Sequence, residues 1–550
     1  MIPLRFAEIF RHRVGGLLIL LASISLMFFC SDKVPLSEVH WDVPIYLYRA
    51  KLLVETPLLH SYSINSYEIA DQVKNQRWPE DEGFPEAYWH FSRLGNTLLL
   101  GLVAYVVNDG LQSIMVANWV YSALLAISLL LSVLLIQSVV SLLHRSQAGR
   151  TLNIAAITSV FLYVGSDIYD YLSGNLVSEV PALLLLIAGV LSFVKANEKA
   201  SPMWAITSGV FAFLLYVVRM ESLWAYGAGV CLLAIFLRWQ NPRTGSYSIL
   251  ILSLVALCVP CGLYTWIFYP LSDPRLFLLF GKLQQNFHGG VSPLKLMIAS
   301  GGVLWLGVVL SVAYAKRSPV IQFAFAWLAL QFVPFAIGAI AGMPSQTRMY
   351  SLAMPTLMLL STQGITCLIE RPARPLFKAV IGFAIAAILI VSNPLLQSAL
   401  RLMPGIWRLD PARSYFTLPK YEKVTYPVGG LAQISRFIYG ISQPIVFLRD
   451  ESIPQEYANL LRFFGPRHAA KNDVALLGDP TNGGDCTKKV SKAPDEPVVF
   501  CTKLTDNDIG RFSGKRLFLM TRQPIQSQVP MQKTILLEVK GLLISELKVP

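Results

Sequence analysis

The stretch Ser37-Glu-Val-His-Trp-Asp42-Val-Pro44-Ile-Tyr46-Leu-Tyr-Arg49-Ala-Lys51 follows the first long apolar segment of the chain. Asp42, Tyr46 and Arg49 are spaced i, i+4 and i+7, so they would share one face of a helix that begins near Pro44. An acid, a phenol and a guanidinium at the membrane surface suit an anionic, lipid-linked substrate. Alternatively, Asp42 only caps the helix, with Pro44 in its first turn. This stretch alone leaves both interpretations open.

The composition places the chain in a membrane. Of its 550 residues, 54% are hydrophobic and 14% are charged, whereas about a quarter of the residues of a soluble protein are charged. We therefore predict a polytopic α-helical membrane protein. The net charge of +13 would also fit a nucleic-acid-binding protein. The lysines and arginines instead fall in short clusters between apolar runs, which is the positive-inside pattern, so we predict no nucleic-acid partner.

The apolar runs predict about 11 transmembrane helices, because a helix needs about 20 apolar residues to cross a bilayer. With the N-terminus in the cytoplasm, nearly all the basic loops lie on the cytoplasmic side and the C-terminus lies outside. The segment 94–108 is apolar but too short for a span, and we interpret it as interfacial or re-entrant. The predicted spans are 14–30, 112–142, 151–166, 180–196, 203–218, 222–238, 247–269, 296–315, 319–342, 349–369 and 376–394.

Two domains are expected. Residues 1–394 form the transmembrane domain, in which 31–111 is the first outer loop with its juxtamembrane helices. Residues 395–550 form a soluble extracytoplasmic α/β domain, because short β-like runs alternate there with polar and Pro- or Gly-containing stretches. These runs are Val474–Leu477, Val498–Cys501, Leu517–Met520 and Ile535–Val539. In an oxidising compartment Cys486 and Cys501 could form a disulfide, and the sequence leaves this open.

Carboxylates and cations accumulate on the predicted outer side, where ionisable groups at membrane depth are candidates for function. A carboxylate can act as general base on an acceptor hydroxyl, and an arginine can bind a phosphate bidentately. Ordinary roles are the alternative: solvated helix ends, a helix N-terminus that favours Glu179, an Arg219–Glu221 ion pair, or lipid-headgroup anchoring by Arg348. Besides the first stretch, the candidates are His90, Arg93, Asp167, Asp170, Glu179, Arg219, Glu221 and Arg348.

The layout of spans and charged outer loops resembles that of the GT-C integral-membrane glycosyltransferases, which use polyprenyl-phosphate-linked sugars. His40-Trp41-Asp42 resembles their first-loop acid site, and the segment from Arg93 onward resembles their juxtamembrane segment. The second outer loop, 167–179, and the basic-x-acid turn Arg219-Met-Glu221 are also similar. The similarity covers roughly residues 10–370. Because no Asp-x-Asp or Asp-Glu pair comes directly after the first span, the need for a divalent cation stays open.

The resemblance implies a bacterial inner-membrane glycosyltransferase. It would pass a sugar from a polyprenyl-phosphate donor to a lipid-linked glycan or protein at the periplasmic face, among membrane lipids. Asp42 would be the general base, Arg348 with Arg219 or Arg93 would hold the donor phosphate, and the second-loop acids would bind acceptor or metal. The alternatives are a transporter or lipid-glycan flippase, and a non-catalytic assembly or receptor protein whose tail is a binding module.

Overall fold

The computed structural model divides the chain into two compact units, each described here by itself. The helical unit comprises Met1–Lys33, Asn118–Tyr264 and Gln284–Lys423, and the mixed unit comprises Val34–Ala117, Thr265–Leu283 and Val424–Pro550. The structure describes residues 38–40, 43–55, 86–107, 109–144, 150–164, 166–173, 175–242, 244–267, 297–298, 300–302, 304–312, 318–340, 347–370, 425–441, 445–449, 456–466, 498–501, 516–521, 532–539 and 541–548.

The helices from α5 to α16 follow the apolar runs of the sequence. They are α5 (Gly110–His144), α6 (Arg150–Val164), α7 (Asp167–Ser173), α8 (Glu179–Lys199), α9 (Pro202–Val218), η1 (Met220–Ser222), α10 (Leu223–Gln240), α11 (Ser246–Ile267), α14 (Leu304–Val312), α15 (Pro319–Ile340), η2 (Thr347–Ala353) and α16 (Met354–Glu370).

Five helical stretches of the described residues are long and apolar enough to cross a membrane, so this is a multi-pass membrane protein. They are Gly110–His144, Glu179–Lys199, Met220–Gln240, Ser246–Ile267 and Tyr350–Glu370. All five coincide with predicted spans. The predicted spans 14–30 and 376–394 lie outside the described residues, and the full count stays a prediction.

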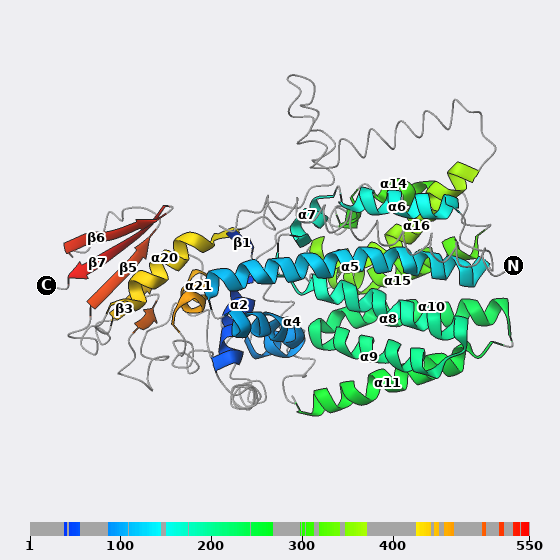
Figure 1. Ribbon diagram of the computed structural model, residues 1–550, viewed down its shortest axis with the longest axis horizontal. Helices are drawn as coiled ribbons and strands as arrows, with labels where there is room; N and C mark the ends of the chain where they lie inside the picture. The colour runs from blue at the N-terminus through cyan, green and yellow to red at the C-terminus, as the bar shows by residue number, and fades with distance from the viewer. Residues whose placement is uncertain are drawn as a thin grey trace, which may run out of the picture. The chain divides into compact units, whose positions relative to one another are not determined.

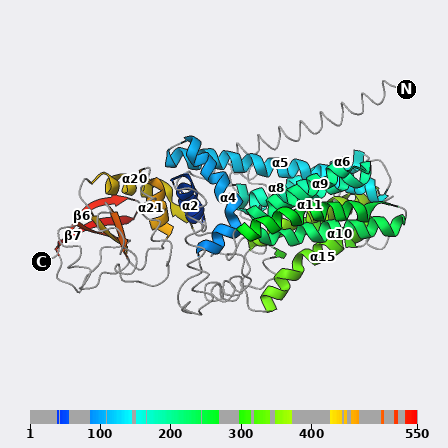
Figure 2. The same cartoon turned by 90° about the horizontal axis from the view of Figure 1, so that it is seen from below.

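Two helices are central in the helical unit. The helix α8 lies against α9 and α10 (Figures 1 and 2). The helix α16 lies against α6, α14 and α15 (Figure 1). Most of the residues in these two spans are buried, 78% in α8 and 83% in the span ending at Glu370, against 17% in α11.

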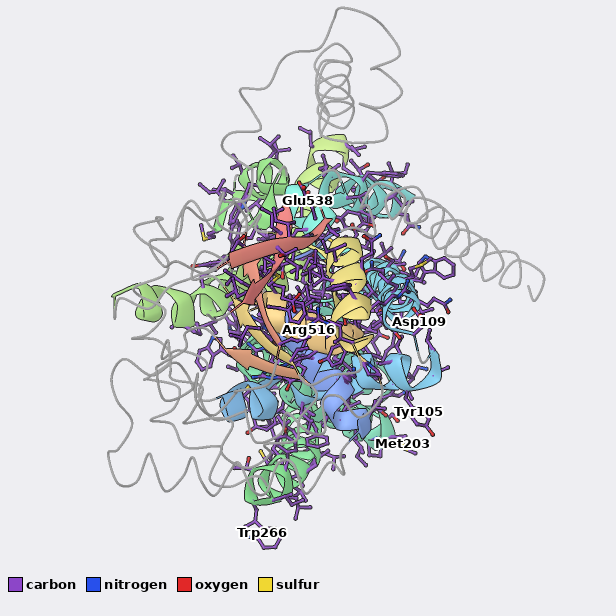
Figure 3. The ribbon with its side chains drawn as sticks, turned by 90° about the vertical axis from the view of Figure 1, so that its left-hand side faces the viewer. Tyr105, Asp109, Met203, Trp266, Arg516 and Glu538 are labelled. Carbon is purple, nitrogen blue, oxygen red and sulfur yellow. The ribbon has the colours of Figure 1, made fainter. Side chains whose placement is uncertain are left out.

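The Trp266 side chain near the end of α11 is 77% exposed and points away from the ribbon in Figure 3. A helix that is apolar all round and exposed on one side suits contact with lipid.

Small residues allow α14 and α16 to pack closely. A Cβ atom at Gly364 would overlap the carbonyl oxygen of Gly307, and one at Gly307 would overlap Ser361. A buried hydroxyl group joins the same interface to α6, since Ser159 Oγ donates to Ser361 Oγ at 3.1 Å. Small residues with interhelical hydrogen bonds are the usual means of association between helices in a membrane.

The variant Gly364→Val is therefore expected to lower the thermal stability of the purified protein, because overpacking a close contact costs about 1–3 kcal/mol. The measurement is the unfolding midpoint in detergent. Gly262→Val is the matched control, because a Cβ atom at Gly262 in α11 would meet no atom within 4 Å. Equal midpoints for the two variants would contradict the packing argument.

The mixed unit combines parts of the predicted first outer loop with the C-terminal part of the chain. From the loop come β1 (Glu38–His40), α2 (Val43–Glu55) and α4 (Glu86–Val107). From the C-terminal part come β2 (Thr425–Pro427), α20 (Val428–Tyr439), β3 (Ile445–Arg449), α21 (Glu456–Phe464), β4 (Val498–Cys501), β5 (Arg516–Thr521), β6 (Gln532–Val539) and β7 (Leu542–Lys548).

The sheet at the C-terminal end has five strands in the order β4-β3-β5-β7-β6. The strand β3 runs parallel to β4 and β5, whereas β7 is antiparallel to both β5 and β6. Arg516 donates two hydrogen bonds to Glu546 across the sheet, which raise the pKa of the guanidinium. The helix α20 lies beside this sheet (Figure 1), and its Phe437 ring packs edge-on against Phe518 of β5, with ring centroids 6.3 Å apart.

Three of the four predicted β-like runs form strands, namely β4, β5 and β6, whereas β3 and β7 were not predicted. The run Val474–Leu477, Cys486 and the predicted domain boundary between 394 and 395 lie outside the described residues. The division into domains and the disulfide therefore stay predictions.

The short apolar segment that follows Arg93 is the second half of α4. The backbone of Arg93 is not helical (φ −136°, ψ 18°) and marks a kink. The helix from Arg93 to Val107 is shorter than a membrane span, in agreement with its exclusion from the predicted spans. Gly101 lets α4 approach α2, because a Cβ atom there would lie 3.3 Å from the carbonyl oxygen of Ala50.

Candidate functional site

A buried ion pair lies at one end of the helical unit. Arg219 Nη1 lies 2.8 Å from Glu179 Oε1, and the side chains of the two residues are 4% and 0% exposed. The same nitrogen donates a hydrogen bond to Ser178 Oγ at 2.9 Å. Burying a charge is costly unless it is paired, so the two residues hold each other in place.

The connections between helices explain how Arg219 reaches Glu179, which is 40 positions earlier. Helices α8 and α9 are joined by a tight turn in which Ala200 has a positive φ of 47°. A short connection makes neighbouring helices antiparallel, so the start of α8 and the end of α9 lie at the same end. The backbone of Arg219 is extended (φ −160°, ψ 92°), which breaks the helix before η1 and turns the side chain out of the α9 helix.

The position of Glu179 suits an acid, and Arg219 keeps one donor for a ligand. Glu179 lies in the first turn of α8, where the helix dipole stabilises a negative charge. Arg219 Nε is buried and donates no hydrogen bond to any described residue. A buried, pre-oriented guanidinium with such an N–H can donate a hydrogen bond to a phosphate or carboxylate oxygen.

Two further elements, η2 and α7, carry predicted site residues. The helix η2, which carries Arg348, contacts both α8 and α7, and α7 carries Asp167 and Asp170. The structure thus brings the backbones of the second outer loop and of the Arg348 turn together. The side chains of these three residues lie outside the described part. Glu221 lies half-buried in η1.

The other predicted site residues belong to the mixed unit. Tyr46 and Arg49 lie on α2 and are 1% exposed, and Arg93 at the α4 kink is 3% exposed. His90 belongs to α4, although its side chain lies outside the described part. Asp42 also lies outside the described residues, immediately before the first residue of α2. The helix predicted near Pro44 is confirmed, since α2 begins at Val43.

Two buried residues that make side-chain hydrogen bonds, Ser178 in the helical unit and Lys51 in the mixed unit, were not predicted as site residues. Ser178 Oγ accepts the hydrogen bond from Arg219 and lies 3.4 Å from Glu179 Oε2. Lys51 Nζ donates to the carbonyl oxygens of Arg462 and Gly465, at 2.8 and 2.7 Å. A lysine is almost never buried without partners. The signal available in the sequence was that Lys51 is on the same predicted helix as Arg49, which suggested that its ammonium would need a partner. Its partners could not be predicted, because they are more than 400 positions away.

Metal binding is not indicated by the side chains that the structure describes, among which no three His, Cys, Asp or Glu residues come close enough to hold an ion. The side chains of Asp167 and Asp170 are not among them. A requirement for a divalent cation therefore stays open.

Comparison with known proteins finds solved structures with a similar fold. No family model matches the sequence, and no curated protein does. The crystal structure of ArnT from Cupriavidus metallidurans bound to undecaprenyl phosphate matches with a TM-score of 0.56 at 12% identity. The match covers 97% of this chain and 98% of ArnT, which indicates a common fold.

Two structures of an oligosaccharyltransferase from Archaeoglobus fulgidus match less closely. The structure tethered with an acceptor peptide has a TM-score of 0.47 at 11% identity, covering 92% of this chain and 69% of that one. The complex of this enzyme, AglB, with an inhibitory peptide and a dolichol-phosphate has a TM-score of 0.45 at 10% identity, with the same coverage. The likeness to ArnT carries the conclusion, because its TM-score is above 0.5: this chain has the same fold as that structure.

Proposed function

We propose that the protein transfers a sugar from a polyprenyl-phosphate donor to a lipid-linked glycan or protein acceptor, at the periplasmic face of a bacterial inner membrane. The observation that carries this proposal is the buried Arg219, held by Glu179 and Ser178, whose Nε donates to none of the residues that the structure describes. It occurs in a fold shared over 97% of the chain with a protein that binds undecaprenyl phosphate. A fixed cation in a membrane protein suits the phosphate of such a lipid.

Arg219 and Arg348 are proposed to hold the donor phosphate, with Arg93 as the further candidate. As the sugar leaves, negative charge develops on the phosphate oxygens, and a guanidinium that is already oriented stabilises this charge without reorganisation. The contact between η2 and α8 supports a shared role for the two arginines. Glu179 orients Arg219 in this scheme.

Asp42 is proposed as the general base. An acceptor hydroxyl oxygen attacks the anomeric carbon as the carbon–oxygen bond to the phosphate breaks, and the hydroxyl proton passes to Asp42. The products are the glycosylated acceptor, with inverted configuration, and polyprenyl phosphate. Tyr46, Arg49, His90 and Glu221 would contact the substrates, and the second-loop acids Asp167 and Asp170 would bind the acceptor or a divalent cation.

The test is turnover of the purified, reconstituted protein with a panel of undecaprenyl-phosphate-linked hexoses and pentoses. Release of undecaprenyl phosphate that depends on an added lipid-linked glycan or peptide acceptor would support transfer. Movement of the lipid between leaflets without release would overturn the proposal in favour of a flippase.

The variant Arg348→Ala is expected to weaken binding of undecaprenyl phosphate about tenfold, because hydrogen bonds to charged groups contribute about 1.5–3 kcal/mol. Binding can be measured by titrating the lipid in nanodiscs. The control is Arg238→Ala, which removes an exposed arginine at the end of α10. Unchanged affinity in Arg348→Ala would remove this residue from the donor site.

A further inference from the structure

The backbone just before Asp42 is tied to the C-terminal part of the chain. The strand β1 ends at His40, two residues before Asp42, and pairs antiparallel with β2. Val39 is opposite Tyr426, and His40 is opposite Thr425. One end of the link that contains Asp42 is therefore held by a strand from the C-terminal part.

The helix just after Asp42 is tied to the same part. The helix α2 packs against α21, and the buried Lys51 ammonium donates to the carbonyl oxygens of Arg462 and Gly465. These oxygens belong to the C-terminal end of α21, where carbonyls lack partners within the helix and a positive charge is favoured. The Arg462 guanidinium also lies over the ring of Tyr48, 5.5 Å from its centroid.

The C-terminal elements that hold the two ends also contact one another. Tyr426 of β2 packs edge-on against Tyr457 of α21, with ring centroids 5.5 Å apart. Ser435 Oγ of α20 donates to the carbonyl oxygen of Leu461 at 2.8 Å. We call β2, α20 and α21 together the cradle.

We propose that the cradle positions Asp42, and that Lys51 is a positioning residue for the transfer reaction. This inference rests on the proposed function, in which Asp42 is the base. Only Trp41 and Asp42 separate β1 from α2, and the elements on both sides of this link are held by the cradle. Part of the C-terminal region then serves the chemistry itself rather than the capture of a separate partner.

Lys51→Met tests the proposal in the full-length, reconstituted protein. We expect kcat to fall about tenfold or more, because a misplacement of about 1 Å can cost 10²-fold in rate, whereas affinity for undecaprenyl phosphate stays unchanged. Lys51→Arg keeps a cation with N–H donors at this position and should retain more activity than Lys51→Met. Lys195→Met is the matched control, because it removes the half-exposed lysine that pairs with Glu198 on α8.

Amide hydrogen exchange of residues 38–40 and 43–55 provides a readout that does not need activity. Faster exchange there in Lys51→Met, but not in Lys195→Met, would demonstrate the link to the cradle. A wild-type protein that transfers no sugar would refute the proposed function, while the exchange result would still test the link.

Two outcomes would overturn the positioning role: a wild-type kcat in folded Lys51→Met, or an equal loss of kcat and donor affinity. If Lys51→Met does not accumulate, Arg462→Met replaces it, since this variant removes the cation over Tyr48 and keeps the backbone carbonyl. We expect its kcat to fall about threefold, in proportion to a cation–π contact. A wild-type kcat in Arg462→Met would then refute the proposal.

Discussion

Replacing Arg219 by methionine is expected to destabilise the protein by about 3–5 kcal/mol and to weaken binding of undecaprenyl phosphate about 100-fold or more. Glu179 is fully buried, and its carboxylate would lose the cation that faces it at 2.8 Å. Methionine is similar to arginine in length, so the loss reflects charge and hydrogen bonds more than packing. The measurements are the unfolding midpoint and the lipid-binding isotherm in nanodiscs.

The double variant Glu179→Gln/Arg219→Met separates stability from binding. Removing both members of a buried ion pair is often neutral for stability, so the midpoint should recover while lipid binding stays lost. Arg238→Met serves as the control for an exposed arginine. Lipid binding that recovered together with stability in the double variant would reduce the pair to a structural role.

The exchange Asp42→Asn is expected to reduce the transfer rate by about 10²–10⁴-fold, the usual contribution of general base catalysis. Asparagine keeps the size of the side chain and its ability to cap a helix, so the fold and the affinity for the donor lipid should stay as in the wild type. The measurement is the single-turnover rate of undecaprenyl phosphate release at saturating donor.

Asp109→Asn is the matched control for this experiment. Asp109 Oδ1 accepts a hydrogen bond from the backbone N–H of Gln112 at the start of α5, a purely capping role that asparagine can replace. It should keep the wild-type rate. Full activity of Asp42→Asn would show that Asp42 is only the cap of α2, which is the alternative that the sequence leaves open.

The helical part of the fold could be predicted from the sequence because its signal is local. Each span is an uninterrupted apolar run, and the hydrocarbon thickness of the bilayer sets its length. The short helix behind Arg93 also corresponds to a local signal, an apolar run too short for a span, whereas the kink at Arg93 was not predicted. For the same reason the strands β4, β5 and β6, which are short β-branched or aliphatic runs, were predicted.

The contacts that build the site could not be predicted, because they join residues far apart in the chain. The sequence indicates that Glu179 and Arg219 are both at outer span ends, but only the packing of α8 beside α9 makes them a pair. Likewise, Lys51 stands out in the sequence only as one more lysine near the membrane. Its function as a C-terminal cap of α21 depends on residues that come 411 positions later.

That separation also has a consequence for biosynthesis. A ribosome adds about 5–20 residues per second, so roughly 20–80 s pass between the synthesis of Lys51 and that of its partner. During this interval β1 has no partner strand and the Lys51 ammonium lacks its carbonyl acceptors from α21, while every described helix from α5 to α16 is synthesised. The membrane helices can therefore assemble first, and a chain truncated before Thr425 would keep them but never complete the mixed unit.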